Sequence, residues 1–221
     1  MTIELFTARI CPYAHRTRLV LLEKGLEARL TEIDFKNKPA RFLAVSPYGR
    51  VPALAHDGTV VYESAIINEY LDETFPAVRL MPAAPALRAF VRIWIDYLDN
   101  HMLDEHYALL KEPDPAKAAE LRARDVERLT FIERDGLARH AGGGPYWLGA
   151  EPTLVDFAYY PFFERLGAWR HYRGLEVPAE CRRLKTWIDA MAGRASVASM
   201  ANDAAYYIKH YAGYAGVQAA A

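Results

Sequence analysis

Two neighbouring residues near the start of the chain, Cys11 and Pro12, carry the clearest chemical signal in the sequence. A strand is predicted over residues 3–7 and a helix over 13–24, so Pro12 takes the first helical position, where proline is favoured. The Cys11 sulfur then faces the positive end of the helix dipole, which lowers a thiol pKa from about 8.5 to between about 3.5 and 7.5. The sequence therefore predicts a thiolate nucleophile at Cys11, with a small apolar core residue as the alternative.

Two further positions offer polar backbone and side-chain groups to a ligand. Val51-Pro52 lies at the start of a predicted strand, where proline has no amide to donate. A cis peptide there would direct the Val51 backbone groups toward a peptide-like ligand, and a trans edge-strand proline is the alternative. Glu63-Ser64 precedes an apolar helix, so Ser64 is expected as its N-cap, and the same amides and hydroxyl can bind a carboxylate.

The elements that position these residues follow from hydrophobic periodicity. We expect strands over residues 3–7, 29–35, 51–55 and 59–62, and helices over 13–24 and 64–74. The first two strands form a β-α-β unit and pair in parallel. The last two flank the turn signal His56-Asp57-Gly58 and form an antiparallel hairpin. A possible short helix lies between these two pairs.

The second half of the sequence predicts helices only. A linker over residues 80–85 precedes long helices over 87–110 and 115–141. Thr153 and Asp156 have the spacing of a capping box at the start of a buried helix that Pro161 is expected to kink, and another helix is expected over 184–191. Cys181 has no comparable helix-start placement in this interpretation and is expected to be structural.

Composition excludes several classes of protein. The 221 residues include 27 Lys and Arg against 28 Asp and Glu, so no basic excess favours a nucleic-acid partner. No segment predicts a secretion leader or a membrane span, and we expect a cytoplasmic protein. Two cysteines form no disulfide framework, and His101 and His106, five residues apart, do not share a helix face, so no metal site is predicted.

Several motifs of the sequence resemble the omega-class glutathione transferases. They cover residues 1 to about 82 and comprise Cys11-Pro12-Tyr13-Ala14-His15-Arg16, Asn37-Lys38-Pro39, Pro47-Tyr48-Gly49-Arg50-Val51-Pro52, Tyr62-Glu63-Ser64-Ala65-Ile66, Glu69-Tyr70-Leu71-Asp72-Glu73 and Phe75-Pro76. One position departs from the family, because His15 stands where a Gln usually precedes Arg16. The resemblance implies an α/β thioredoxin-like, glutathione-binding domain over residues 1–80, an all-α domain over 86–221 that forms the acceptor pocket, and a homodimer.

The resemblance also implies roles for individual residues toward glutathione, the expected cosubstrate. Cys11 would be the nucleophile that forms a mixed disulfide with glutathione. Lys38 would pair with the glycyl carboxylate, with an ordinary solvated lysine as the alternative, and Val51 before a cis Pro52 would bind the cysteinyl portion. Glu63 and Ser64 would hold the γ-glutamyl end. These charges complement the two carboxylates and the ammonium of glutathione.

A cysteine in place of the Tyr or Ser of conjugating transferases favours removal of glutathione over conjugation. The expected reactions are thiol transfer from mixed disulfides and reductive cleavage of glutathionyl ketones. Two alternatives stay open. The tail also resembles bacterial glutathione lyases that act on lignin-derived aryl ketones, and some proteins with this fold are non-catalytic binding or regulatory subunits.

The acceptor is expected to be small, and aromatic or disulfide-bearing, because aromatic residues gather in the predicted pocket between the domains. The candidates are Tyr13, Tyr107, Phe162, Trp169, Tyr207 and Tyr211. In the lyase alternative, Tyr207 or Tyr211 would protonate the developing enolate. The competing interpretation is that these aromatics form the core of the helical bundle.

Overall fold

The computed structural model describes residues 2–140 and 142–217 and divides the chain into two compact units. Unit 1 is Met1–Arg88 and unit 2 is Ala89–Ala221. The division falls inside helix α4 (Pro85–Tyr97), which begins in the predicted linker. The predicted order of an α/β part followed by an all-helical part is confirmed.

Unit 1 alternates strands and helices in the predicted order. Its elements are β1 (Ile3–Thr7), α1 (Pro12–Glu23), β2 (Arg29–Glu32), α2 (Ala40–Val45), β3 (Ala53–His56), β4 (Thr59–Tyr62) and α3 (Ser64–Thr74). β2 is shorter than predicted because Asp34 starts a turn, in which its carboxylate accepts a bond from the Lys36 amide at 2.9 Å. β3 begins only after the Val51-Pro52 bond, which is cis.

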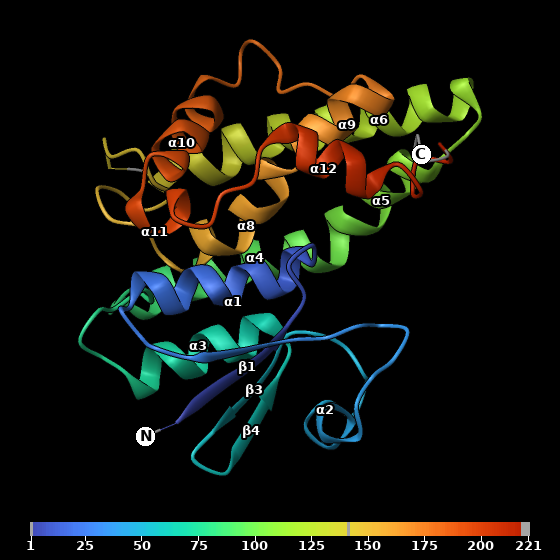
Figure 1. Cartoon of the computed structure of the whole chain (residues 1–221). Helices are drawn as coiled ribbons and strands as arrows, with labels where there is room; N and C mark the ends of the chain where they lie inside the picture. Colours follow the sequence, from blue (N-terminus) through green and yellow to red (C-terminus); the bar gives the residue numbers. More distant parts are fainter. Residues whose placement is uncertain (1, 141, 218–221) are drawn as a thin grey trace. The chain divides into compact units, whose positions relative to one another are not determined.

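The sheet has the order β2-β1-β3-β4. β1 pairs with β2 in parallel, and β3 and β4 form the predicted antiparallel hairpin. β1 also pairs antiparallel with β3, so the sheet is mixed, and α1 packs against α3 beside it (Figure 1). All five residues of β1 are buried, which means that both faces of the sheet are covered along this strand.

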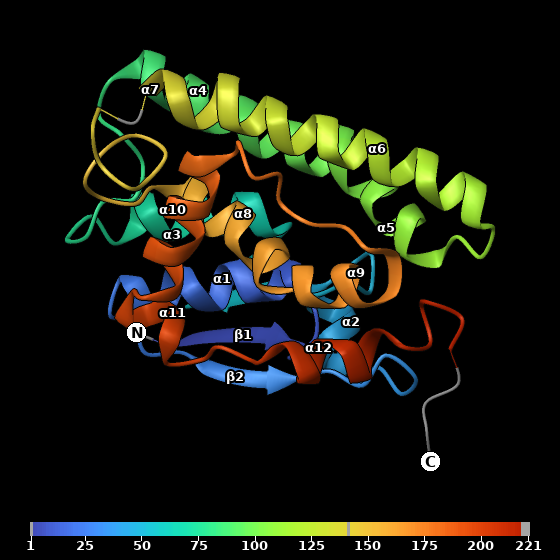
Figure 2. The ribbon, with the colours of Figure 1, turned by 90° about the horizontal axis from the view of Figure 1, so that it is seen from above.

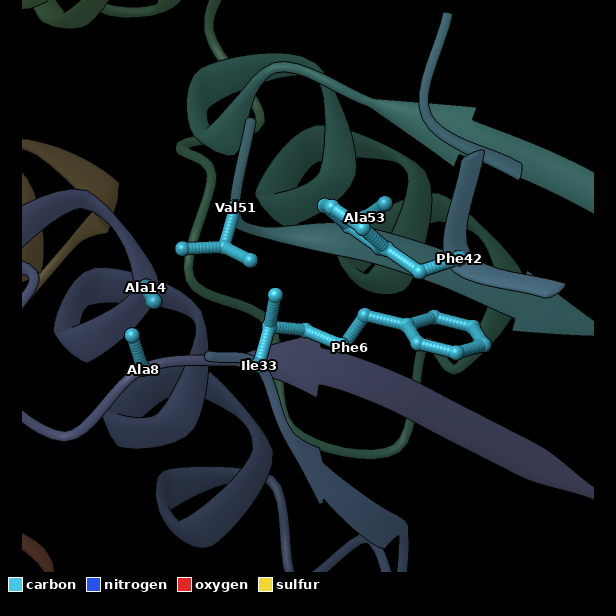
Figure 3. Close-up of a cluster of buried hydrophobic side chains, with 7 residues drawn as sticks. All are labelled: Phe6, Ala8, Ala14, Ile33, Phe42, Val51 and Ala53. Carbon is cyan, nitrogen blue, oxygen red and sulfur yellow. The ribbon is translucent and has the colours of Figure 1, made fainter. Parts of the chain in front are cut away.

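A cluster of buried side chains joins the sheet to the segments that carry the candidate site. Phe6 of β1 and Phe42 of α2 have ring centroids 5.8 Å apart, and Val51 lies with Ala14 of α1 toward the carboxyl end of β1 (Figure 3). Cys11 packs against the same cluster. The core therefore fixes the start of α1 relative to the segment before β3.

A buried ion pair joins the end of α1 to α3 in unit 1. Lys24 Nζ, at the end of α1, lies 3.0 Å from Asp72 Oδ1 of α3. The Asp72 carboxylate also accepts the backbone amides of Leu80 at 2.7 Å and Met81 at 3.1 Å, and Lys24 donates to the Val78 carbonyl. Removing one partner of a buried pair costs about 3–5 kcal/mol, so this contact anchors the segment that leads out of unit 1.

The regular elements of unit 2 in its described residues are helices, joined by turns and by one isolated bridge between Tyr146 and Gly149. After α4 the unit contains the π-helical turn η1 (Leu98–Met102), α5 (Leu103–Lys111), α6 (Pro115–Phe131), the π-helical turn η2 (Ile132–Leu137), α7 (Ala138–His140), α8 (Leu154–Glu164), α9 (Leu166–Arg173), α10 (Arg182–Ala192), α11 (Ala195–Ala198) and α12 (Ala204–Tyr211). α5 packs along α6 (Figure 2). None of the helices in 2–140 and 142–217 is long and apolar enough to cross a membrane.

The two predicted long helices are each interrupted by a π-helical turn. η1 separates α4 from α5, and η2 separates α6 from α7. A single π turn inside an α-helix keeps the hydrogen-bonded ladder while changing its register, and hydrophobic spacing does not reveal it. Residue 141, the predicted end of the second helix, lies outside the described residues.

The predicted capping box at the start of α8 is confirmed. The Asp156 carboxylate accepts the Thr153 amide at 2.7 Å, and Pro161 lies inside the same helix. Asp156 is fully buried and accepts three further bonds, from the Thr153 hydroxyl at 3.1 Å, the Trp147 amide at 3.1 Å and Trp187 Nε1 at 2.8 Å. Burial raises the pKa of Asp156 to about 6, against these hydrogen bonds, which lower it.

Candidate functional site

Cys11 lies where the sequence predicts it, at the start of the first helix. It is the N-cap of α1, and Pro12 takes the first helical position. The Cys11 side chain is partly exposed, and its thiol donates to the Val51 carbonyl oxygen at 3.7 Å. The sulfur therefore lies next to the cis Val51-Pro52 bond, which brings together two predicted site residues that are 40 positions apart in the sequence.

The turn before Cys11 is held by an arginine whose role sequence reasoning missed. Arg18 of α1 is buried and donates to Thr7 Oγ1 at 2.6 Å, to the Ala8 carbonyl at 3.0 Å and to the Arg9 carbonyl at 3.0 Å. These acceptors are the last residue of β1 and the two that follow it. Arg18 thus satisfies the polar groups of the strand-to-helix turn, which fixes the position of Cys11.

A second buried arginine joins α1 to the start of α3. Arg16 donates to Ser64 Oγ at 3.3 Å, and its guanidinium lies 5.0 Å from the centre of the Tyr13 ring. Arg16 is fully buried and Tyr13 is partly exposed. Tyr13 and Ser64, both predicted site residues, therefore contact the same cation.

Glu63 and Ser64 correct one detail of the sequence interpretation. The N-cap of α3 is Glu63, and Ser64 is the first helical residue. Glu63 has φ 68°, a left-handed conformation that is costly for a residue other than glycine and that is concentrated at functional sites. The strained turn places Ser64 inside the helix, so its hydroxyl accepts from Arg16 instead of capping the helix.

Lys38 lies beside the loop that leads to Val51. The side chain is exposed, and its Nζ lies 3.3 Å from the position that a Cβ would take at Gly49. Gly49 has φ 59°, which favours glycine. The Lys38 ammonium therefore lies against the loop over residues 46–50, in which Ser46 Oγ donates to the Arg50 carbonyl at 2.7 Å.

In unit 2, three of the predicted pocket residues form one aromatic cluster. Tyr107 of α5 and Trp169 of α9 have ring centroids 5.2 Å apart, and Trp169 lies 5.2 Å from Tyr211 of α12. The Tyr107 and Tyr211 hydroxyls are 3.3 Å apart. Tyr107 is partly exposed, whereas Trp169 and Tyr211 are buried. We refer to these three residues as the Tyr107 cluster.

The other two predicted pocket residues of unit 2, Phe162 and Tyr207, are buried at 2% and 0% exposure. The Tyr207 hydroxyl donates to Glu164, and its ring lies 4.6 Å from the Arg165 guanidinium. Burial raises the pKa of Tyr207, which keeps its hydroxyl protonated. These contacts are those of a core residue, and they distinguish Tyr207 from the Tyr107 cluster.

A pocket of about 290 Å³ lies elsewhere in unit 2. It is lined by Phe90, Ile93, Trp94, Tyr97, Phe131, Asp135, Arg139 and His140, and none of the predicted pocket residues is among them. Gly136 lies behind it, where a Cβ would come within 2.8 Å of Trp147. Glycine is required there because a Cβ would also come within 3.3 Å of the Trp94 ring.

Cys181 is also an N-cap, of α10, and this corrects the expectation that it has no helix-start placement. The helix begins two residues earlier than predicted, at Arg182. Cys181 is fully buried, and desolvation raises the pKa of its thiol. The start of α10 is already bound by a carboxylate, because Glu133 accepts the amides of Arg183 at 3.0 Å and Leu184 at 2.7 Å.

The described part of the chain contains no cluster of three or more His, Cys, Asp or Glu residues that could hold a metal ion. His101 is exposed and His106 is buried, so the two residues do not lie together.

Two family models match the sequence, one in each unit. Residues 10–74 match the glutathione S-transferase N-terminal domain, and residues 135–190 match the glutathione S-transferase C-terminal domain. Among curated proteins, glutathione S-transferase omega-1 of Sus scrofa is 30% identical over 190 residues, which cover 86% of this chain and 76% of the relative.

Solved structures agree with the sequence matches. Glutathione transferase Omega 3C from Trametes versicolor has a TM-score of 0.86 at 30% identity and covers 97% of this chain and 90% of its own. A rice transferase crystallised in complex with glutathione has a TM-score of 0.87 at 26% identity and covers 97% and 96%.

Proposed function

Because the chain belongs to the glutathione S-transferase family and is omega-like, we propose that it is a thioltransferase that removes glutathione from mixed disulfides or glutathionyl ketones through Cys11. Glutathione-dependent transferase activity follows from the family. The thiol-transfer reaction and the residues that perform it are our proposal. We assign glutathione binding to residues 1–80 and the acceptor to residues 86–221.

The single observation that carries the proposal is the environment of the Cys11 sulfur. Cys11 is partly exposed at the N-cap of α1, with Pro12 at the first helical position and the Val51 carbonyl 3.7 Å from Sγ. A helix N-terminus stabilises a thiolate, and the thiolate is the form that attacks sulfur. The backbone of Val51 would pair with the cysteinyl portion of bound glutathione.

The ends of glutathione carry charges that the remaining residues complement. The start of α3 at Glu63 and Ser64 would take the γ-glutamyl group, with its carboxylate at the helix N-terminus and its ammonium at the Glu63 carboxylate. Lys38, held against the loop before Val51, would pair with the glycyl carboxylate. Arg16 adds a buried positive charge next to Ser64.

The proposed chemistry has two steps. The Cys11 thiolate attacks the glutathionyl sulfur, so that a Cys11–glutathione disulfide forms and the bond from sulfur to the acceptor breaks with its electron pair leaving on the acceptor. A mixed disulfide releases a thiolate, and a glutathionyl ketone releases an enolate. Each takes up a proton. A second glutathione thiolate then attacks the mixed disulfide, which releases oxidised glutathione and regenerates the Cys11 thiolate.

We test the proposal by measuring turnover of a small glutathione mixed disulfide and of a glutathionyl aryl ketone with the native protein, Cys11→Ala and Cys181→Ala. Loss of the nucleophile should lower both rates by at least about 1,000-fold, because no other group replaces it. Cys181→Ala removes the other cysteine and should retain both rates. Mass spectrometry should detect the glutathionyl adduct on Cys11 of the native protein.

A native protein that binds glutathione but turns over neither substrate would refute the thioltransferase proposal. Failure to bind glutathione at all would favour the alternative of a non-catalytic protein with this fold. Homodimer formation is part of the proposal and is tested by light scattering, in which the mass of a monomer would contradict it.

One observation favours the lyase alternative as a second candidate. The hydroxyls of Tyr107 and Tyr211 lie 3.3 Å apart, so one hydroxyl can donate a hydrogen bond to the oxygen of the other. The accepting hydroxyl then keeps its own proton, which it can transfer to an enolate. Tyr207 lacks this arrangement because its hydroxyl is bound to Glu164. Replacing Tyr211 by Phe should then lower turnover of the aryl ketone and leave the mixed disulfide unchanged. Equal effects on both substrates would contradict a role in enolate protonation.

A further inference from the structure

A buried histidine and aspartate form a hydrogen-bonded pair between α5 and α6. His106 Nδ1 lies 2.8 Å from Asp125 Oδ2, and the two side chains are 2% and 1% exposed. An ionised carboxylate only accepts hydrogen bonds, so the proton lies on Nδ1 of His106. This bond lies in the plane of the imidazole ring and therefore fixes the ring's orientation.

The charge of Asp125 is balanced without requiring a charged histidine. Arg128 donates to Asp125 Oδ1 at 3.3 Å and to Glu105 at 2.6 Å. Arg124 forms a further ion pair with Glu105 at 3.5 Å. His106 is therefore needed at Asp125 as a hydrogen-bond donor of fixed geometry, whereas the counter-charge comes from Arg128.

His106 contacts Trp169 at two points, once through its imidazole ring and once through its backbone carbonyl. The two rings are stacked, with centroids 4.3 Å apart and planes 11° from parallel. The Trp169 Nε1 also donates to the His106 backbone carbonyl at 2.8 Å. One residue thus fixes both the plane of the indole and the direction of its N–H.

Histidine at this position buries a polar ring nitrogen, which an apolar ring such as that of Phe would not do. Within the described residues, His106 Nε2 is buried and has no hydrogen-bond partner. An unsatisfied buried polar atom destabilises a fold. Phe would stack without that cost but would not bind Asp125, and Asn would bind Asp125 but would not stack. Of these three side chains, histidine alone provides both contacts.

Trp169 in turn positions Tyr107, the partly exposed member of the Tyr107 cluster. Its ring packs edge-on against Tyr107 and against Tyr211, and the hydroxyls of the two tyrosines meet. We propose that His106 and Asp125 are positioning residues for the acceptor site, because they set the Trp169 plane against which Tyr107 presents its surface to an aromatic acceptor. This inference rests on the proposed function for the identity of the acceptor.

The test compares binding on a Cys11→Ala background, which separates positioning from chemistry. The probes are a glutathionyl aryl ketone and glutathione itself. We expect His106→Asn, which retains a donor to Asp125 but removes the stacked ring, to raise the Kd of the aryl ketone by about fivefold to tenfold and to leave that of glutathione unchanged. His101→Asn, on the exposed residue of the neighbouring π turn, is the matched control and should change neither Kd.

A second measurement does not depend on activity or on the ligand. The emission of Trp169, obtained as the difference between the protein and its Trp169→Phe variant, should change in His106→Asn and stay unchanged in His101→Asn. With cysteine-competent protein, His106→Asn should raise the KM of the aryl ketone and leave its kcat, and both constants for a small mixed disulfide, at native values.

The outcomes distinguish the two proposals. A folded His106→Asn protein with native emission and an unchanged ratio of the two Kd values would overturn the positioning role, even where Cys11-dependent turnover is present. Absence of turnover with an altered ratio would refute the thioltransferase proposal and support the positioning role. If the aryl ketone binds no more tightly than glutathione to the Cys11→Ala protein, the Tyr107 cluster is not an acceptor site and the inference fails.

Discussion

The helices of unit 1 and unit 2 differ in whether a carboxylate of the chain accepts backbone N–H groups at their N-termini. In unit 2, four helices begin at a carboxylate that accepts backbone N–H groups, and these are Asp114 for α6, Asp156 for α8, Glu133 for α10 and Asp203 for α12. In unit 1, the N-cap residues of α1, α2 and α3 form no side-chain cap bond, and their first turns contain no acidic residue.

The difference indicates which helix starts are structural and which are available to a ligand. The first amides of a helix need acceptors, and an anion is favoured there by the helix dipole. Unit 2 supplies its own anions at the starts of α6, α8, α10 and α12, so these four starts are closed, whereas the first turns of α9 and α11 contain no acidic residue. The first turns of α1 and α3 in unit 1 also contain no acidic residue, which suits a thiolate at Cys11 and a carboxylate of glutathione at Ser64.

The two cysteines show the same contrast within one residue type. Neither forms a disulfide and both are N-caps, Cys11 of α1 and Cys181 of α10. Cys181 is buried at a start that Glu133 already occupies, and desolvation together with Glu133 and Glu180 raises its pKa. Helix-start placement is therefore insufficient for a reactive thiol. A reactive thiol also needs access to solvent and a helix start at which no carboxylate already binds the first amides.

The largest effect on stability should follow from removing a carboxylate that binds backbone amides at the start of a unit 2 helix. Replacing Asp156 by Ala leaves the amides of Trp147 and Thr153 and the Trp187 N–H without their acceptor inside the core. We expect a loss of about 3–5 kcal/mol in the free energy of unfolding, measured by urea denaturation. Asp104→Ala, at an exposed first-turn position of α5, is the control and should cost less than about 1 kcal/mol. Equal losses would show that the closed start of α8 has no special role.

The contrast between the cysteines predicts their alkylation rates. In the native protein at neutral pH, iodoacetamide should modify Cys11 about 100-fold faster than Cys181, because one thiol is partly exposed at a helix start and the other is buried with a raised pKa. Peptide mass spectrometry over time gives both rates. In denaturant the two rates should become similar. A Cys181 that reacts as fast as Cys11 in the folded protein would contradict the comparison.

Burial of Asp156 also predicts a pH dependence. Its pKa rises from 3.8 to about 6 on folding, so between these values the folded protein holds a proton that the unfolded chain has lost. This contribution to stability is complete below about pH 4 and is lost as the pH rises through about 6, by an amount on the order of 3 kcal/mol.

The measurement compares urea unfolding of the native protein and of Asp156→Asn from pH 4 to pH 8. The native advantage over the variant should shrink with rising pH up to about 6 and then stay constant. An advantage that grows over this range would mean that the hydrogen bonds outweigh the desolvation of the carboxyl.

The smallest effect on stability should follow from adding a carboxylate to the first turn of α3, which contains none. Ile66 lies in the first turn of α3 and is 59% exposed, so Ile66→Asp adds a carboxylate there with little loss of packing. The helix dipole should raise the free energy of unfolding by about 0.5 kcal/mol. The same charge should weaken glutathione binding several-fold, because it competes with the γ-glutamyl carboxylate. Calorimetry measures both changes. Ile66→Asn is the neutral control, and tighter glutathione binding by Ile66→Asp would refute the proposed role of this helix start.

The features that sequence predicts best are those that depend on a few adjacent residues. Proline after Cys11 fixes the start of α1, Thr153 and Asp156 form their capping box, and the helix over 64–74 has the predicted bounds. In each case neighbouring residues supply the hydrogen bonds or fix the dihedral angles. The N-cap of α3 is the exception, since the left-handed turn at Glu63 has no glycine to signal it.

The features that sequence does not predict depend on distant contacts. Arg18 and Arg16 appear in the sequence as polar residues of an amphipathic helix, yet both are buried and hold the turn before Cys11 and the start of α3. The closed start of α10 requires Glu133, which lies about fifty residues earlier in the chain. The aromatic residues of unit 2 gave no basis for separating the Tyr107 cluster from core residues such as Tyr207, because both kinds of site use the same side chains.

The π turn η1 has a consequence for insertions and deletions in this region. A π turn amounts to one extra residue in an α-helix, and each residue of an α-helix advances its neighbours by about 100° around the axis. Deleting one residue from Leu98–Met102 would therefore convert the π turn into an ordinary α turn and leave His106 and Tyr107 facing Trp169. Deleting one residue from the α-helical segment just after it would instead rotate His106 and Tyr107 by about 100° around the helix axis, away from Trp169. The π turn is thus a place where this helix can lose a residue without changing the direction in which α5 faces.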